Sequence, residues 1–399
     1  MIRNRTTLRL VAASLAVLAT GCAPQTKKPT PQQSANVQWN GARSTVMISL
    51  AKDQYDAGQL DKARQTINQA MKLSPESANA RILSAKIAIE QQQLEVAEKE
   101  LRLAREFDPK NAEADYLGGV VYQRWQKPDL AYECYSHASD KAPTELAYLL
   151  ARAEMLVAME RGPEALKLLL DRVVYFEHSS AIRDAVGQLL IQQKKFPEAV
   201  AMIREATVLT PDDMTVREHL GMAMFYAGQY DQAILVLSRL VTQEKFAGRP
   251  ELHAALGECY DQTGQFREGR ASFEQATKLD PSSAGLWLGL GKAAMQLDDY
   301  RRAELSLKKA MAIDPSSTEA NLLLGYLRFR QNRLPEALVA FKQVSNAPDA
   351  DPVSLCMTGL VLQKLGHADD AVQYYAKALK RNPNDELAHH LMAGLDTRE

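Results

Sequence analysis

The chain has 399 residues, of which 46% are hydrophobic and 24% charged, the balance of a folded soluble protein and not of a disordered one. Its formal net charge is −1, which argues against the broad basic face that a nucleic-acid-binding protein uses to neutralise phosphates. Aromatic residues make up only 7%. Alanine and leucine supply much of the apolar content, which favours helices over sheets.

The first residues have the composition of an export signal. Three arginines and no acidic residue precede an apolar run over residues 10–19, and small residues follow it before Cys22. The run is shorter than the stretch of about 20 apolar residues that crosses a bilayer. We therefore expect residues 1–21 to be a cleaved signal peptide.

The segment from Leu18 to Cys22 resembles the lipobox of bacterial lipoproteins, with Ala19 where that family more often has leucine. The resemblance implies cleavage before Cys22 and acylation of this residue. Several acyl chains would anchor the protein firmly, because each buried CH₂ contributes about 0.8 kcal/mol. The alternative is a plain secretory signal with a chance cysteine.

Residues 22–43 are polar and proline-rich without periodicity, which predicts a flexible tether behind the lipidated cysteine. Ala23 follows the cysteine, where an aspartate in enteric relatives would retain a lipoprotein in the inner membrane. The lipoprotein resemblance thus implies a lipid-anchored protein of the bacterial cell envelope, on the periplasmic face of the outer membrane.

A repeat of 34 residues runs from residue 44 to residue 385, with a single step of 36. Small residues mark the repeat in two registers, twelve residues apart. The first register consists of Ala51, Ala85, Gly119, Ala153, Gly187, Gly221, Gly257, Gly291, Gly325 and Gly359. The second consists of Ala63, Ala97, Ala131, Ala165, Ala199, Ala233, Gly269, Ala303, Ala337 and Ala371.

This pattern resembles the tetratricopeptide repeat, and the best match runs from Trp287 through Tyr300 and Ala303 to Pro315. Small residues let paired helices approach closely, and the proline ends the second helix. Glycines mark the turn between the helices where a positive φ is easiest, at Gly58, Gly228, Gly264 and Gly366.

The resemblance implies an all-α fold, a right-handed superhelical α-solenoid of about ten helix-turn-helix repeats over residues 44–385. Residues 386–399 are expected to form a capping helix and tail, which cover the last apolar face. The repeats are expected to start near residues 44, 78, 112, 146, 180, 214, 250, 284, 318 and 352.

Two places depart from the repeat. The unit from Leu146 to Ser179 has Arg172 at a position that is otherwise small or apolar, and Glu177 where proline usually falls. The segment 246–249 carries a two-residue insertion. We expect local changes of superhelical curvature at both places, and no domain break.

No constellation of residues predicts catalysis, a cofactor or a metal site. Cys134, Cys259 and Cys356 fall in the third, seventh and tenth units, too far apart for a disulfide, and are expected to be buried thiols. No Cys-x-x-Cys or His-Glu-x-x-His motif is present. His219 and His253 lie on first helices of neighbouring units and could approach each other, but ordinary packing roles are favoured over a metal.

The resemblance also implies that first helices line a concave surface, with positions 2, 5, 9, 12 and 13 of each unit facing a ligand. An aromatic patch beside an acidic one would suit a peptide with apolar anchors and basic residues. The alternative is that aromatics such as Phe225 and Phe329 pack between units. The candidate residues are Glu218, Met222, Phe225, Tyr226, Glu258, Asp261, Lys292, Tyr326 and Phe329.

The sequence therefore predicts a membrane-anchored scaffold that binds other proteins or peptides during assembly of an envelope complex, with no nucleic acid and no small-molecule substrate. Pilus, secretion, export and cell-wall machineries are all compatible with it. Two alternatives stay open. One is a transferase or hydrolase with a site hidden among the repeats, and the other is a purely structural solenoid that self-associates through its ends.

Overall fold

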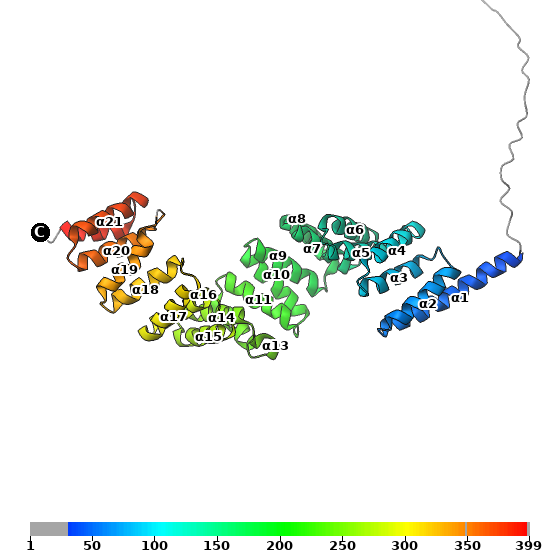
Figure 1. The fold of residues 1–399 in the computed structure, drawn as a ribbon, viewed down its shortest axis with the longest axis horizontal. Helices are drawn as coiled ribbons and strands as arrows, with labels where there is room; N and C mark the ends of the chain where they lie inside the picture. Colours follow the sequence, from blue (N-terminus) through cyan, green and yellow to red (C-terminus); the bar gives the residue numbers. More distant parts are fainter. Residues whose placement is uncertain (1–30, 348, 397–399) are drawn as a thin grey trace, which may run out of the picture. The chain divides into compact units, whose positions relative to one another are not determined.

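The computed structural model describes residues 31–347 and 349–396, and every regular element in these ranges is a helix (Figure 1). The predicted signal peptide and Cys22 lie outside the described residues. The prediction of an all-α repeat fold is confirmed. None of the helices in the described ranges combines the length and the apolar character needed to cross a membrane.

Contacts divide the chain into two compact units, Met1–Ala142 and Pro143–Glu399. The division lies between the third and fourth repeats, and the predicted domain bounds stay predictions. The boundary falls just before α7. Tyr148 on that helix is the only aromatic residue at the third position of the ten repeats, and Glu145 makes no capping hydrogen bond at the start of the helix.

The first unit contains three helical hairpins, each with a first and a second helix. Its helices are α1 (Pro31–Asp56), α2 (Leu60–Leu73), α3 (Ala78–Glu90), α4 (Leu94–Phe107), α5 (Ala112–Arg124) and α6 (Pro128–Lys141). Helix α1 corrects the predicted tether, because residues 31–43 are helical. Proline is tolerated in a first helical turn, and no further proline interrupts the segment.

The second unit contains seven hairpins and a final helix. The first four hairpins comprise α7 (Leu146–Ala158), α8 (Gly162–Val173), α9 (Ser180–Gln192), α10 (Phe196–Leu209), α11 (Met214–Tyr226), α12 (Tyr230–Leu240), α14 (Pro250–Gln262) and α15 (Phe266–Leu279). The others comprise α16 (Ala284–Gln296), α17 (Tyr300–Ile313), α18 (Thr318–Arg330), α19 (Leu334–Ser345), α20 (Pro352–Lys364) and α21 (Ala368–Arg381), and α22 (Glu386–Asp396) follows them.

The core of each hairpin matches a small residue on the first helix to a larger one on the second. At position 8, counted from the first residue of a unit, an added Cβ on Gly325 would lie 2.5 Å from the Phe341 ring at position 24. Gly359 and Tyr375 repeat this pair at 2.5 Å. The four units with an aromatic residue at position 24 all have glycine at position 8, whereas alanine occurs there only opposite isoleucine or leucine. The close approach predicted from the small residues is thus built from matched volumes.

The turns inside the hairpins need a left-handed residue at position 15. The four predicted glycines have φ between 70° and 86° there, so the turn prediction is confirmed. The other six units place a non-glycine residue in the same conformation, with φ between 56° and 60°: Gln92, Gln126, Glu160, Lys194, Asp298 and Asn332. Non-glycine residues pay about 1–2 kcal/mol for this conformation. In these six units the turn therefore cannot be recognised in the sequence by a glycine.

The structure is irregular at both places where the sequence departs from the repeat, the unit 146–179 and the segment 246–249. Helix α8 ends at Val173 in a 3₁₀ turn over Val174–Phe176, and the Arg172 guanidinium lies 5.7 Å from the exposed Tyr175 ring. After the short helix α12, the insertion forms the single turn α13 (Glu244–Ala247) and buries Phe246. The expected changes of curvature stay predictions.

The three cysteines that the structure describes are free and buried. Burial raises the pKa of the Cys259 thiol to about 12 and that of Cys356 to about 11. A thiol with so high a pKa stays protonated and unreactive at neutral pH. The prediction of buried thiols is confirmed.

Candidate binding site

In each compact unit, the predicted ligand-facing positions of the first helices line a hollow. In the first unit, a hollow of about 370 Å³ lies between α1 and α3 and reaches the start of α5. All of its lining residues except Leu83 stand at positions 2, 5, 9, 12 or 13 of their units. They are Ile48, Lys52, Tyr55, Asp56, Asn79, Ile82, Leu83, Lys86 and Glu113. We call this surface of the first helices the first-helix face.

The first-unit hollow combines apolar and charged groups. Its Lys86 ammonium is 2.5 Å from the Glu113 carboxylate, and both side chains are partly exposed. Burial raises the pKa of Tyr55, and the charge of Glu90 adds to the effect. The hollow therefore offers an apolar floor with a cation, a carboxylate and a phenol at its margin, the mixture found at peptide-binding surfaces.

The second unit has a more apolar hollow of about 260 Å³ between α7 and α9. Leu150 and Val157 on α7 face it together with Leu189 on α9. Glu154, Gln188 and Gln192 add polar groups, and Ala153, Leu169 and Ala185 complete its walls. The predicted site residues come from later units and include none of either lining. The same position rule, applied to the earlier units, picks out most of the first lining and Leu150, Glu154, Val157, Gln188 and Gln192 of the second.

Two of the predicted aromatics form a ring cluster on the second unit. The rings of Phe225 and Tyr226 are 5.1 Å apart, and Phe196 stacks on Tyr226 at 5.6 Å. Tyr226 is exposed, whereas Phe225 and the neighbouring Met222 are half-buried. Tyr226 is therefore the member of the cluster that a partner can reach most easily.

Glu218 does not offer a free carboxylate, and this corrects its assignment to the ligand-facing set. The residue is 6% exposed, and its carboxylate lies 2.5 Å from the Arg249 guanidinium. The pair forms because Arg249, the last residue of the inserted segment, precedes α14 and reaches back to α11. Sequence spacing alone cannot show such a pairing, since regular units lack the insertion.

The predicted acidic patch is only partly exposed. Glu258 is exposed, whereas Asp261 is half-buried and packs so closely on Gly269 that an added Cβ there would lie 2.3 Å from Asp261 Oδ1. Burial, together with the charge of Glu258, raises the pKa of Asp261 to about 6, and the charge of Lys292 opposes the rise. Lys292 itself lies 2.5 Å from Glu319.

Tyr326 and Phe329 are half-buried and pack against the core, in line with the alternative that Phe329 packs between units. Tyr326 meets the Phe341 ring edge-on at 5.4 Å, and burial raises its pKa. Both residues lie against the buried cluster that includes Met357 and Val361 of the next hairpin. The Lys364 ammonium lies 5.6 Å from the Phe329 ring.

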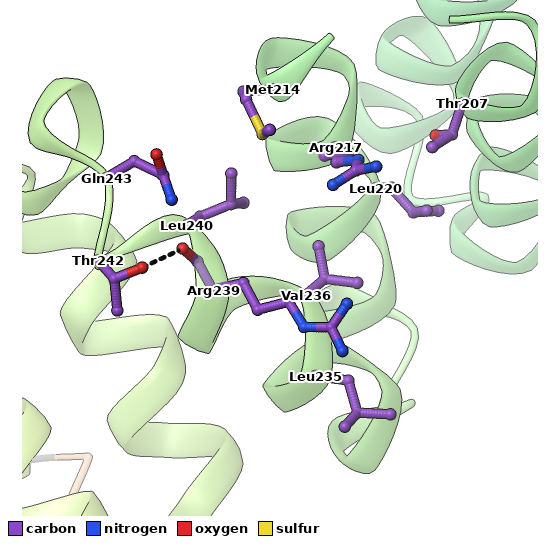
Figure 2. Close-up of a pocket in the computed structure, with 10 residues that line it drawn as sticks. All are labelled: Thr207, Met214, Arg217, Leu220, Leu235, Val236, Arg239, Leu240, Thr242 and Gln243. Atoms are coloured by element: carbon purple, nitrogen blue, oxygen red, sulfur yellow. Dashed lines mark hydrogen bonds between the residues drawn. The ribbon is translucent and has the colours of Figure 1, made fainter. Parts of the chain in front are cut away.

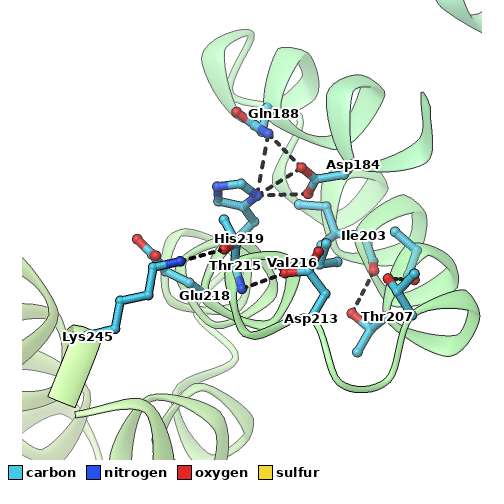
Figure 3. A network of polar contacts seen from close by, with 12 residues as sticks. Asp184, Gln188, Ile203, Thr207, Asp213, Thr215, Val216, Glu218, His219 and Lys245 are labelled. Carbon is cyan, nitrogen blue, oxygen red and sulfur yellow. Dashed lines mark hydrogen bonds and ion pairs between the residues drawn. The ribbon is translucent and has the colours of Figure 1, made fainter. Parts of the chain in front are cut away.

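His219 and His253 do not pair with each other. The His219 Nδ1 atom is 2.8 Å from Asp184 Oδ1, and the Gln188 amide contacts both side chains (Figure 3). The hydrogen bond with Asp184 raises the pKa of His219. His253 Nε2 lies 3.0 Å from the carbonyl oxygen of Ala247. Within the described ranges, no group of three or more His, Cys, Asp or Glu residues could hold a metal ion.

Residues 177–398, more than half of the chain, match the model of the family described as the cilia and flagella-associated protein 70 C-terminal domain. Residues 54–118 match a tetratricopeptide-repeat model. The chain belongs to this family of tetratricopeptide-repeat proteins. The resemblance seen in its 34-residue period is thereby confirmed.

Solved tetratricopeptide-like structures are also similar in part. A crystal structure of MamA is 23% identical with a TM-score of 0.39, and the match covers 41% of this chain and 95% of that one. MamA from Desulfovibrio magneticus RS-1, residues 41 to the end, is 20% identical with a TM-score of 0.41, covering 44% of this chain and 97% of that one. No curated protein matches the chain.

Proposed function

We propose that this tetratricopeptide-repeat protein is a non-catalytic scaffold that binds segments of other proteins on its first-helix face. The observation that carries the proposal is that, in each compact unit, the ligand-facing repeat positions line a hollow that mixes apolar and polar groups. Tetratricopeptide-repeat proteins bind other proteins. A partner side chain that fills such a hollow removes apolar surface from water and contributes roughly 25 cal/mol per Å² buried.

The hollow between α7 and α9 gives the sharper test, because its walls are mainly apolar. We expect Leu150→Lys/Val157→Lys to place two ammonium groups where a partner would bury an apolar side chain. Burying an uncompensated cation is costly, so recovery of partners should fall at least about tenfold. Partners recovered with the tagged full-length chain from detergent-solubilised cells, and identified by mass spectrometry, measure this.

A matched control is Leu305→Lys/Val339→Lys, which changes two exposed residues on second helices. Both variants should keep the far-UV circular dichroism and the melting temperature of the parent. If the same partners are recovered with the groove variant as with the control, the first-helix face is not the binding surface. If only further copies of the chain are recovered, the self-associating structural role replaces the scaffold.

We also propose that the protein is anchored to a membrane of the bacterial envelope through Cys22. The basic head, the apolar run over residues 10–19 and the lipobox-like segment support this. Ala23 after the cysteine favours the outer membrane. The pilus, secretion, export and cell-wall machineries remain the candidate settings of such a scaffold.

The substitution Cys22→Ser tests the anchor, because a hydroxyl in place of the thiol cannot take the thioether-linked lipid. We expect the parent chain in the membrane fraction and the variant in the soluble fraction, with the acyl mass missing from its N-terminal peptide. Thr26→Ser, a change in the same segment, should leave the distribution unaltered. A parent chain that is recovered without acyl groups would refute the anchor and leave the plain secretory signal.

A further inference from the structure

A third hollow lies away from the first-helix face, where α10, α11 and α12 meet the segment that leads into α13 (Figure 2). It has a volume of about 510 Å³, within the range of pockets that hold small ligands or peptide side chains. Its walls are Thr207, Met214, Arg217, Leu220, Leu235, Val236, Arg239, Leu240, Thr242 and Gln243. None of them stands at position 2, 5, 9, 12 or 13, so the hollow is separate from the proposed groove.

The hollow exists because the repeat is irregular at this point. Helix α12 has 11 residues, whereas the second helices α10 and α15 have 14. It ends at Leu240, and the chain then turns away, so that Thr242 and Gln243 no longer continue the helix. Thr242 and Gln243 therefore form one wall of the hollow, beside Leu240 at the end of the helix. Leu235 is 63% exposed, like Leu305 and Val339 at the same repeat position in other units, and adds an apolar side chain to the wall.

The charges in the hollow are unbalanced. Arg217 on α11 is half-buried and Arg239 on α12 is exposed, and both extend into the region shown in Figure 2. Among the residues that the structure describes, neither guanidinium has an ion pair or a hydrogen-bond partner, although most arginines of the chain have one. No carboxylate belongs to the walls. Two unpaired cations beside an apolar surface form a site for an anion that carries apolar groups.

We propose that this hollow binds an acidic, apolar segment of a partner protein, with leucine-like side chains on Leu220, Leu235 and Val236 and carboxylates on the two arginines. Guanidinium groups bind carboxylates through two parallel hydrogen bonds, which fixes the orientation of the segment. The threonine hydroxyls and the Gln243 amide at the rim can bond its main chain. The chain's own residues 1–30 contain no aspartate or glutamate, so they lack the complementary charge.

The test is fluorescence anisotropy of the full-length chain with a labelled eight-residue peptide, in which two leucines are flanked by glutamates. A second peptide carries lysines in place of the glutamates. We expect the acidic peptide to bind at least about tenfold more tightly than the basic one, and its affinity to fall as salt is raised. Arg217→Glu/Arg239→Glu should weaken the acidic peptide at least about tenfold and improve the basic one.

Arg267→Glu/Arg301→Glu is the matched control, because it changes the net charge equally at two exposed arginines outside the hollow. It should bind the acidic peptide as the parent does. Equal affinity for both peptides, or equal loss in both arginine variants, would overturn the proposal. So would arginine-dependent binding to vesicles of phosphatidylglycerol without peptide binding, since the site would then belong to a lipid.

The arginine-lined hollow and the first-helix groove can be tested independently of each other. The groove variant Leu150→Lys/Val157→Lys should bind the acidic peptide as the parent does, because its changes lie between α7 and α9. Loss of cellular partners only in the groove variant, together with no peptide binding, would reject the arginine-lined site and keep the groove. Light scattering adds the remaining outcome. If Arg217→Glu/Arg239→Glu converts an oligomer into a monomer, the occupant is a second copy of the chain.

Discussion

Phe273→Ala is expected to lower the free energy of unfolding of the second compact unit by about 3–5 kcal/mol, the upper range for truncating a buried aromatic residue. Phe273 is 6% exposed and lies between two glycines, Gly257 of its own hairpin and Gly289 of the next. Neither glycine has a side chain that could move into the cavity. Urea unfolding followed by far-UV circular dichroism measures the loss.

The substitution Gly289→Ala tests whether the Phe273 ring and this glycine are in the close contact described. An added Cβ on Gly289 would lie 2.3 Å from the Phe273 ring, so Gly289→Ala should destabilise the parent chain. In the Phe273→Ala variant, Gly289→Ala should instead raise the free energy of unfolding. The alanine methyl group then fits into the space left by the ring, and alanine is favoured over glycine in a helix by about 1 kcal/mol. The same sign in both backgrounds would contradict the packing described for this site.

Arg249→Met is expected to cost roughly 2 kcal/mol, because it leaves the buried Glu218 carboxylate without its partner. A fully buried pair would lose more, but the Arg249 side chain is 39% exposed and water screens part of the charge. The double variant Glu218→Gln/Arg249→Met should recover part of the loss, since a neutral amide replaces the unpaired charge.

The exposed pair of Lys292 and Glu319 provides the reference for this experiment, with side chains that are 47% and 53% exposed. Lys292→Met should cost less than about 0.5 kcal/mol, as exposed ion pairs usually do. Thermal unfolding of the three variants and the parent at one pH gives the comparison. Equal losses for Arg249→Met and Lys292→Met would show that Glu218 is solvated in solution.

The fold was predictable because its signal is repeated ten times. Small residues at position 8 and at position 20 report a close contact that recurs in every hairpin, so the period and the helix pairs could be derived without coordinates. The helix over residues 31–43 was not predictable in this way, since it precedes the first small residue of the period. Nor was the boundary before Pro143, since the 34-residue period continues across it without a change in spacing.

The sequence predicted which repeat positions face the candidate site, but not which individual residues form it. Positions 5, 9 and 12 do line hollows, but which units leave them open depends on neighbouring side chains of different length. Glu218 forms an ion pair with Arg249 of the inserted segment, and Tyr326 contacts the edge of the Phe341 ring. The contacting residues, Arg249 and Phe341, do not stand at first-helix positions. A rule that considers only those positions therefore cannot predict these contacts. The arginine-lined hollow arises from a shortened helix, and the sequence shows this only as a change in spacing.

The matched glycine–aromatic pairs also bear on how such an array can grow by gene duplication. A recombination event that copies a whole hairpin carries both members of a pair, and the new copy arrives with its interior already compatible. A crossover between the two helices could instead join the alanine of one unit to the tyrosine of another, for which there is no room. Exchange between repeats of this gene should therefore be tolerated at hairpin borders and selected against within them.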